Sequence, residues 1–325
     1  MNKTIAIILL ALAPLINIYA QTQERFFKII GEVSGFADST KIYLNNSDST
    51  FIINGKFNFS GSVDDKEIMT LHTKGYTDYN MLWIENSIIR FHAEKGDFRN
   101  AKITGSAIQA AADSLQEKID KFGDDRNQYV TFIKTNPSSL LSVYLLDVYA
   151  ATWGRDTTEM LFKDLIPQMQ HTSYGAKISN FIALNKNVKI GDRYWDFEQL
   201  NPANKSIKLS DLKNKVILLE FWGSWCIPCR KGHPELIRIY NKYKKAGFEI
   251  LGVAADRDRT QWLNAIKEDR LPWENVSDLK GDENEAALIY GINHYPTNFL
   301  IKDGVIIAVD LKKAELETEL AKLLR

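Results

Sequence analysis

The chain has 325 residues with 45% apolar and 11% aromatic side chains, and its 41 basic side chains balance 41 acidic ones. This length suggests about two domains of ordinary size, each with enough apolar residues for a core, which excludes a disordered chain. The zero net charge excludes a strong attraction to nucleic acid or to an anionic membrane, and the two cysteines are too few for a disulfide framework.

The amino terminus has the layout of a secretory signal peptide. Residues 4–20 are almost wholly apolar, follow the single Lys3, and end at Ala20 before a polar stretch. A spanning helix needs about 20 apolar residues, whereas this run is shorter and is interrupted by Pro14. We therefore predict a signal peptide over residues 1–20, cleaved near Ala20, and a protein exported to the periplasm. Retention as a signal anchor at the membrane is the alternative.

Residues 26–104 consist of short, β-rich apolar runs separated by turn residues. Phe57 and Phe59 alternate with polar neighbours, as half-buried strand residues do. Asn54 and Gly55 stand between two such runs and indicate a tight turn, because both tolerate positive φ angles. The pattern predicts an all-β domain, either a sandwich or a barrel.

Residues 105–187 change to helical periodicity and predict a helical layer that connects two domains. Asn136 and Pro137 predict a helix start, since proline fits the first turn of a helix. Residues 188–325 then alternate between strands and helices. Continuous apolar runs such as residues 216–221 predict strands covered on both faces, and thus an α/β domain with a central sheet between helices.

The two cysteines, Cys226 and Cys229, stand three positions apart where a predicted buried strand meets a predicted helix. A c-type haem site would need histidine directly after the second cysteine, but that residue is Arg230. A structural zinc ion would need two more ligands, which His233 and His294 would have to supply together. A redox dithiol needs only the pair at a helix amino terminus, and we favour this interpretation.

The start of a helix stabilises a thiolate, because its first N–H groups are unpaired and its dipole is positive there. We therefore expect Cys226 to ionise below the usual thiol pKa of about 8.5. Pro228 suits the first turn and stiffens the loop, and Trp225 is expected to shield Cys226 and shape access to it. Arg230 either adds positive charge to the site or is a solvated helix residue.

Glu220 is the one charged residue in the apolar run before the cysteines. Burial on a core strand would raise its pKa and suit it to accept the proton of Cys229. The alternative is an exposed strand-end glutamate without a role. A second element, His294 to Thr297, places Pro296 at the start of a predicted strand, where proline is tolerated without any function.

With these motifs in view, residues 188–325 resemble the thioredoxin fold, and within it the thiol-disulfide oxidoreductases of the TlpA and ResA type. The resemblance runs through SDLKNKVILLEFWGSWCIPCRK, YNKYKKAGFEILGVAAD and YGINHYPTNFLI. Residues 26–104 resemble, more loosely, a β-rich domain of unknown function that often precedes such modules in secreted bacterial proteins.

The resemblance implies a redox-active disulfide in which Cys226 is the exposed attacking cysteine and Cys229 the resolving one. It implies that Pro296 is a cis-proline facing the disulfide, and that Tyr295 lies on the loop that pairs with a bound substrate chain. Two departures are an Ile-Pro dipeptide between the cysteines and a tyrosine, Tyr295, where isoleucine is usual. Reduction potential and partner choice are therefore not carried over.

The functional prediction is a protein-disulfide oxidoreductase that acts outside the cytoplasm, in the reducing direction, without cofactor or metal. Its partners would be client proteins with disulfides, such as apocytochromes c awaiting haem or misoxidised secreted proteins, and a membrane thiol-reducing protein as electron donor. One alternative is a thiol peroxidase, although the P-x-x-x-T-x-x-C setting of peroxiredoxins is absent. Another is a partner-binding protein that uses the redox module as a sensor or tether.

Overall fold

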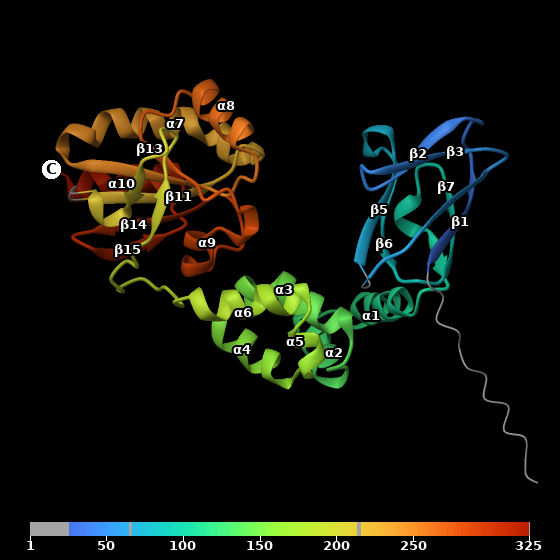
Figure 1. The fold of residues 1–325 in the computed structure, drawn as a ribbon. Helices are drawn as coiled ribbons and strands as arrows, with labels where there is room; N and C mark the ends of the chain where they lie inside the picture. The colour runs from blue at the N-terminus through green and yellow to red at the C-terminus, as the bar shows by residue number, and fades with distance from the viewer. Residues whose placement is uncertain (1–25, 65–66, 213–215, 325) are drawn as a thin grey trace, which may run out of the picture. The chain divides into compact units, whose positions relative to one another are not determined.

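The computed structural model describes residues 26–64, 67–212 and 216–324 (Figure 1). The chain divides into two compact units, with the boundary after Gln116. The predicted signal peptide over residues 1–20 lies outside the described residues. Among the residues that are described, no helix combines the length and the apolar character needed to cross a membrane.

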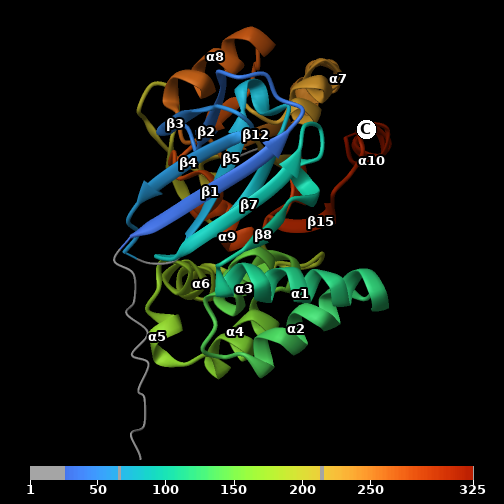
Figure 2. The same ribbon diagram turned by 90° about the vertical axis from the view of Figure 1, so that its right-hand side faces the viewer.

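The first unit is a β-sandwich of two four-stranded sheets, in the orders β4-β1-β7-β8 and β3-β2-β5-β6. Figure 2 shows β1 between β4, its antiparallel neighbour, and β7, its parallel neighbour. The strands are β1 (Phe27–Ser34), β2 (Thr40–Leu44), β3 (Asp48–Ile52), β4 (Lys56–Gly61), β5 (Glu67–Thr73), β6 (Tyr79–Ile84), β7 (Ile88–Glu94) and β8 (Lys102–Thr104).

The sandwich core follows from the alternation of apolar and polar residues. Side chains from both sheets, such as Phe57 and Phe59 in one and Leu71 in the other, pack into one buried cluster. The predicted turn is present, because Asn54 and Gly55 both take positive φ angles, 49° and 70°. The all-β prediction for this region is thus confirmed as a sandwich.

A helical segment follows, as predicted. It consists of α1 (Ala107–Phe122), α2 (Asp125–Thr135), α3 (Leu140–Trp153), α4 (Arg155–Asp164), α5 (Pro167–Gln170) and α6 (Ser173–Leu184). The predicted helix start at Asn136 and Pro137 is wrong. Asn136 instead ends α2, since a residue before proline disfavours helix, and the Ser139 side chain caps α3 by accepting from the Leu141 N–H at 3.2 Å.

The second unit also holds a five-stranded sheet in the order β13-β12-β11-β14-β15. The central β11 pairs parallel with β12 and antiparallel with β14. The elements are β9 (Glu198–Leu200), β10 (Ser206–Lys208), β11 (Val216–Trp222), α7 (Ile227–Tyr243), β12 (Phe248–Ala254), α8 (Arg259–Asp269), β13 (Glu274–Val276), α9 (Glu285–Tyr290), β14 (Thr297–Lys302), β15 (Val305–Val309) and α10 (Lys313–Leu323). This is the predicted thioredoxin fold.

Helices cover both faces of this sheet, with α7 and α8 on one side and α9 on the other (Figure 1). Along β11, Leu218 packs toward α7 and α10, whereas Leu219 packs toward α9. All seven residues of β11 are buried. A strand that is buried on both faces explains the continuous apolar run in the sequence.

The helical segment is attached to the thioredoxin-like part of the second unit through the end of α6. The Asn185 side chain donates a hydrogen bond to the Leu288 carbonyl at 2.9 Å, and the Lys186 N–H donates to the Ile289 carbonyl at 3.1 Å. Leu184 and Val188 pack against the core cluster beside α9. Polar and apolar contacts together therefore hold α6 beside α9.

The central position of β11 yields a stability prediction. Leu219→Ala removes a fully buried side chain and should lower the free energy of unfolding by about 2–5 kcal/mol. The matched control is Leu200→Ala on β9, where the side chain is 47% exposed and the change should stay within about 0.5 kcal/mol. Urea unfolding followed by tryptophan fluorescence measures both, and equal losses would contradict the placement of β11.

Candidate active site at the start of α7

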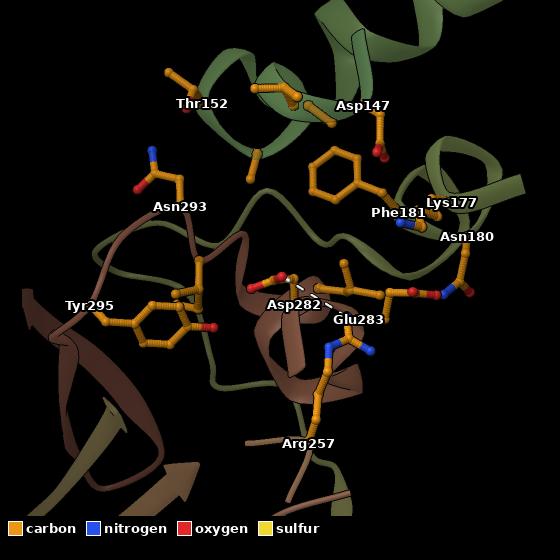
Figure 3. A pocket seen from close by; sticks show the side chains of 15 residues that line it. Asp147, Thr152, Lys177, Asn180, Phe181, Arg257, Asp282, Glu283, Asn293 and Tyr295 are labelled. Atoms are coloured by element: carbon orange, nitrogen blue, oxygen red, sulfur yellow. Dashed lines mark ion pairs between the residues drawn. The ribbon is translucent and has the colours of Figure 1, made fainter. Parts of the chain in front are cut away.

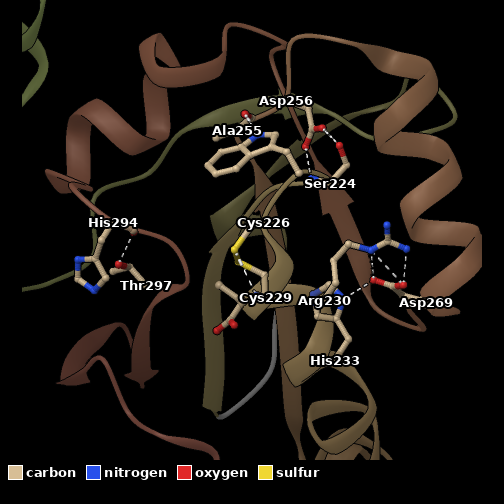
Figure 4. Close-up of a disulfide and its surroundings, with 12 residues drawn as sticks. Ser224, Cys226, Cys229, Arg230, His233, Ala255, Asp256, Asp269, His294 and Thr297 are labelled. Carbon is tan, nitrogen blue, oxygen red and sulfur yellow. Dashed lines mark hydrogen bonds and ion pairs between the residues drawn. A yellow bond between two sulfur atoms is a disulfide. The ribbon is translucent and has the colours of Figure 1, made fainter. Parts of the chain in front are cut away.

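A disulfide joins Cys226 and Cys229 where β11 leads into α7 (Figure 4). Cys226 is the cap of α7, and its sulfur accepts a hydrogen bond from the Cys229 N–H at 3.2 Å. Pro228 occupies the first turn, where its missing N–H removes no helical hydrogen bond. The two sulfurs therefore lie at the positive end of a helix of 17 residues.

The disulfide is covered rather than open. Cys226 is only 4% exposed and packs in a cluster with Trp222 and Tyr295. The expectation of an exposed Cys226 is therefore wrong for this disulfide-bonded form, because side chains from β11 and from the loop before β14 pack against it. Access to the sulfur requires the covering side chains to move or a client to replace them.

Trp225 and Tyr295 form the surface beside the disulfide. Trp225 is 53% exposed, and its indole N–H donates to the Ala255 carbonyl at 3.0 Å. Its ring meets that of Tyr295 edge to face, with centroids 5.3 Å apart. The peptide bond between Tyr295 and Pro296 is cis. The structure thus brings the cysteine loop and the loop before β14 together, although about 70 residues separate them.

Glu220 lies on the face of β11 that α7 and α10 cover. It is 3% exposed, and its Oε1 accepts from the Lys313 ammonium at 3.1 Å, while its Oε2 has no hydrogen-bond partner among the described residues. Burial raises the pKa of Glu220 above its usual value, Lys313 opposes the rise, and Asp310 adds to it. The alternative of an exposed strand-end glutamate is therefore wrong.

A second buried carboxylate, Asp256, holds the cysteine loop in place. It follows β12 and accepts hydrogen bonds from the Ser224 N–H, at 3.0 Å, and from the Ser224 hydroxyl. Burial raises the pKa of Asp256, and the bonds from Ser224 oppose this rise. The sequence contained a usable signal, because Asp256 follows a strand parallel to β11 and so lies at the same edge of the sheet.

Arg230 is engaged away from the cysteines. Its guanidinium binds Asp269 at 2.7 Å and Glu268 at 2.8 Å. His233 also contacts Asp269, through Nδ1 at 2.7 Å. Partial burial acts to raise the pKa of Asp269, but the bonds from Arg230 and His233 hold it below its usual value. The structure therefore supports neither interpretation of Arg230, because its guanidinium is neither solvated nor free to act as a charge at the sulfurs.

The two histidines considered as zinc ligands have separate surroundings. Burial lowers the pKa of His233, a buried residue of α7 that contacts Asp269. His294 is exposed and lies 3.5 Å from Asp310. Within the part of the chain that the structure describes, no group of three or more His, Cys, Asp or Glu side chains could hold a metal ion.

Comparison with known proteins identifies the family. The sequence profile of the AhpC/TSA family matches residues 190–309, and a domain of unknown function, DUF4369, matches residues 27–111. The thiol-disulfide oxidoreductase ResA of Bacillus cereus is 31% identical over 168 residues, which cover 51% of this chain and 95% of that protein. This chain belongs to the ResA family of thiol-disulfide oxidoreductases. ResA of Bacillus subtilis is 30% identical over 146 residues, covering 45% of this chain and 78% of that protein.

Solved structures of similar proteins match the thioredoxin-like part of this ResA relative. The thioredoxin domain of a thiol-disulfide oxidoreductase from Bacteroides vulgatus is 32% identical and covers 42% of this chain and 99% of its own, with a TM-score of 0.40. A thiol-disulfide oxidoreductase from Bacteroides fragilis is 36% identical and covers 41% of this chain and 100% of its own, with a TM-score of 0.39. Neither of the two sequence profiles covers residues 112–189.

Lys313, like Asp256, is a residue of this ResA-type site that sequence reasoning missed. It lies 93 positions from Glu220 and begins α10, where a lysine carries no pattern that distinguishes it from a solvated helix residue. Only the packing of α10 against the sheet brings its ammonium to the buried carboxylate. Family membership supports a protein-disulfide oxidoreductase. The buried pair of Glu220 and Lys313 adds a group beneath α7 that can bind a proton.

The raised pKa of Glu220 predicts how stability depends on pH. Glu220 ionises at higher pH in the folded chain than in the unfolded chain, where its value is about 4.3. The free energy of unfolding therefore falls as the pH rises from about 4.3 through the raised pKa of Glu220 in the folded chain. Glu220→Gln has no such charge, so its stability relative to the native sequence should rise with pH over that window, by at most about 1.4 kcal/mol per pH unit.

Lys313→Met is the matched variant, and it should make stability depend more strongly on pH instead of less. It removes the cation that opposes the rise, so the pKa of Glu220 climbs further and the loss of stability continues to higher pH. Urea unfolding at a series of pH values measures both variants. Stability curves that run parallel to that of the native sequence would show that Glu220 does not titrate as its burial requires.

Proposed function

We propose that this ResA-type chain reduces disulfides of client proteins outside the cytoplasm, with Cys226 and Cys229 as its redox pair. The observation that carries the proposal is the bridged cysteine pair at the start of α7, opposite the cis peptide before Pro296. This arrangement puts a nucleophile and a resolving thiol on one helix terminus beside a loop that can hold a client chain.

In the first step the reduced Cys226 thiolate attacks one sulfur of a client disulfide. A mixed disulfide forms between Cys226 and the client, and the other client sulfur leaves as a thiolate that takes a proton from water. The start of α7 supports this step, because the helix dipole and the Cys229 N–H both stabilise negative charge on the Cys226 sulfur.

In the second step Cys229 loses its proton and attacks the Cys226 sulfur. The client sulfur departs as a thiolate that takes a proton from water, and the intramolecular disulfide between Cys226 and Cys229 forms, so that two electrons have passed to the client. Glu220 is proposed to accept the Cys229 proton, since a buried carboxylate of raised pKa is a better base than a solvated one. Lys313 is proposed as a positioning residue that keeps Glu220 ionisable.

Client contact is proposed at the surface beside the disulfide. The backbone at Tyr295 and Pro296 would pair with an extended client segment, as edge strands do when they accept a peptide. Trp225 offers an exposed aromatic face next to this loop. Pro228 would keep the cysteine loop in its shape while the client exchanges sulfurs.

The proposed location follows from the amino terminus, and the proposed electron donor follows from the balance of electrons. Residues 1–20 are proposed to direct export to the periplasm, where apocytochromes c or misoxidised secreted proteins would be clients. Each turnover leaves the chain oxidised, so an external donor, proposed to be a membrane thiol-reducing protein, must return two electrons. The relatives are named thiol-disulfide oxidoreductases, and no observation favours the peroxidase alternative.

Two cysteine variants test the redox pair. Cys226→Ser should reduce insulin no faster than the background, because the attacking sulfur is gone. Cys229→Ser should still attack but cannot resolve, so a mixed disulfide with insulin should accumulate on a non-reducing gel. Insulin reduction by Cys226→Ser at the native rate would refute the proposed roles.

The reducing direction predicts a low equilibrium potential. Titration of the purified chain against glutathione should place the Cys226 and Cys229 pair near about −270 mV, the value typical of a cellular reductant. A value near about −120 mV, typical of a strong oxidant, would reverse the proposed direction of electron flow. Mass spectrometry after thiol alkylation counts the reduced and oxidised molecules at each point.

A further inference from the structure

A cavity of about 350 Å³ lies within the second unit, between the helical segment and the loops beside the disulfide (Figure 3). Its walls come from α3 and α6 on one side and from Arg257, Asp282, Glu283, the end of α9 and the loop before β14 on the other. We infer that this cavity receives a basic side chain of the client polypeptide, next to the client's reacting cysteine. The inference rests on the proposed function, which it deepens by naming the chemistry that the site prefers.

Tyr295 connects the cavity to the redox site. Its ring meets Trp225 edge to face on one side, packs with the cluster that contains both cysteines, and lines the cavity (Figure 3). A client segment that pairs with the backbone at Tyr295 would therefore lie beside a residue that lines the cavity. In an extended segment successive side chains point to opposite sides, so a residue close to the client cysteine would point into it.

The chemistry of the lining selects the occupant. Val148, Ala150, Phe181, Leu288 and Ile292 provide apolar walls that suit the methylene stem of a lysine or arginine. Charged side chains then surround the space, with three carboxylates against two cations: Asp147, Asp282 and Glu283 against Lys177 and Arg257. The excess of one carboxylate favours a cationic head over an anionic one.

Asp147 is the carboxylate best placed to receive that head. The structure gives it no hydrogen bond or ion pair among the described residues, whereas Arg257 already faces Asp282 at 3.9 Å. Burial raises the pKa of Asp147 to about 6, Lys177 opposes this rise, and Glu283 and Asp282 add to it. A cation in the cavity would offset both the burial and the repulsion between the carboxylates.

The wall that carries Asp147 comes from the helical segment of the second unit. Residues 112–189 lie outside both family profiles, and the contacts of Asn185 and Lys186 hold α6 beside α9. The whole chain has zero formal net charge, so its net charge favours neither basic nor acidic clients at long range. A preference between such clients must then arise from local contacts of this kind.

The test uses the reduced full chain and two synthetic disulfide-linked peptides of equal length. Their sequences are identical except that lysines flank the cysteine in one and glutamates flank it in the other. The second-order rate constant should be about fivefold larger for the lysine peptide at physiological ionic strength. Equal rates, or a faster glutamate peptide, would overturn the inference.

Three variants locate the preference. Asp147→Asn keeps the shape but removes the charge, and Ala151→Phe fills the cavity from α3; both should bring the ratio of the two rates close to one. The control Asp164→Asn removes an exposed carboxylate of α4 that does not line the cavity, and it should keep the native ratio. A native ratio in Asp147→Asn and Ala151→Phe would also overturn the inference.

Glutathione disulfide separates this inference from the proposed function. If the native chain exchanges with glutathione disulfide but shows no peptide preference, the cavity does not select clients while the redox pair stands. If the native chain exchanges with neither glutathione disulfide nor the peptides, the redox proposal itself fails, and the inference fails with it. Stopped-flow tryptophan fluorescence or quenched thiol alkylation gives the rates.

Discussion

The burial of β11 on both faces is the constraint on which the second unit depends. Its odd-numbered side chains pack toward α9 and its even-numbered ones toward α7, α8 and α10, so a one-residue slip would exchange the contacts of the two sets. Because β11 pairs in parallel with β12, the carboxyl ends of these two strands lie at the same edge of the sheet. The chain leaves the strand there and begins α7, which places Cys226 at a helix terminus.

The same burial creates the electrostatics beneath the disulfide. Glu220 is on the even-numbered face and is 3% exposed, and Lys313 of α10 binds it. Asp269 differs, because Arg230 and His233 both bind it and hold its pKa low. One carboxylate is thus stabilised as an anion by its partners, whereas the other remains a group whose charge state can change. A proton acceptor beneath a thiol pair requires the second kind.

The helical segment gives this ResA relative a surface that its thioredoxin-like part alone does not contain. α3 and α6 stand opposite the loop that carries Tyr295 and enclose a cavity with it. The Tyr295 ring packs against the cluster that contains the disulfide and also lines the cavity. In the proposed mechanism, recognition of the client and the cover of the disulfide therefore share one side chain.

Local patterns in the sequence determined much of this protein. The apolar run before Cys226 and the helical periodicity after it located β11, α7 and the disulfide between them, and Asn54 with Gly55 located a turn. Periodicity and turn chemistry act over a few residues, so one sequence suffices to read them. The short strands β8, β9, β10 and β13 were missed because three residues carry too little periodicity.

Only the tertiary structure decided which distant groups meet. It brings Lys313 to Glu220, 93 positions away in the sequence, and Ser224 to Asp256. It also pairs Arg230 with Asp269. Tyr295 packs beside the Cys226 sulfur, which had been expected to be exposed. Such pairings depend on the path of the backbone and on the faces that strands and helices present to one another. A lysine at a helix start looks the same in sequence whether it is solvated or seated against a buried carboxylate, and the fold alone separates the two.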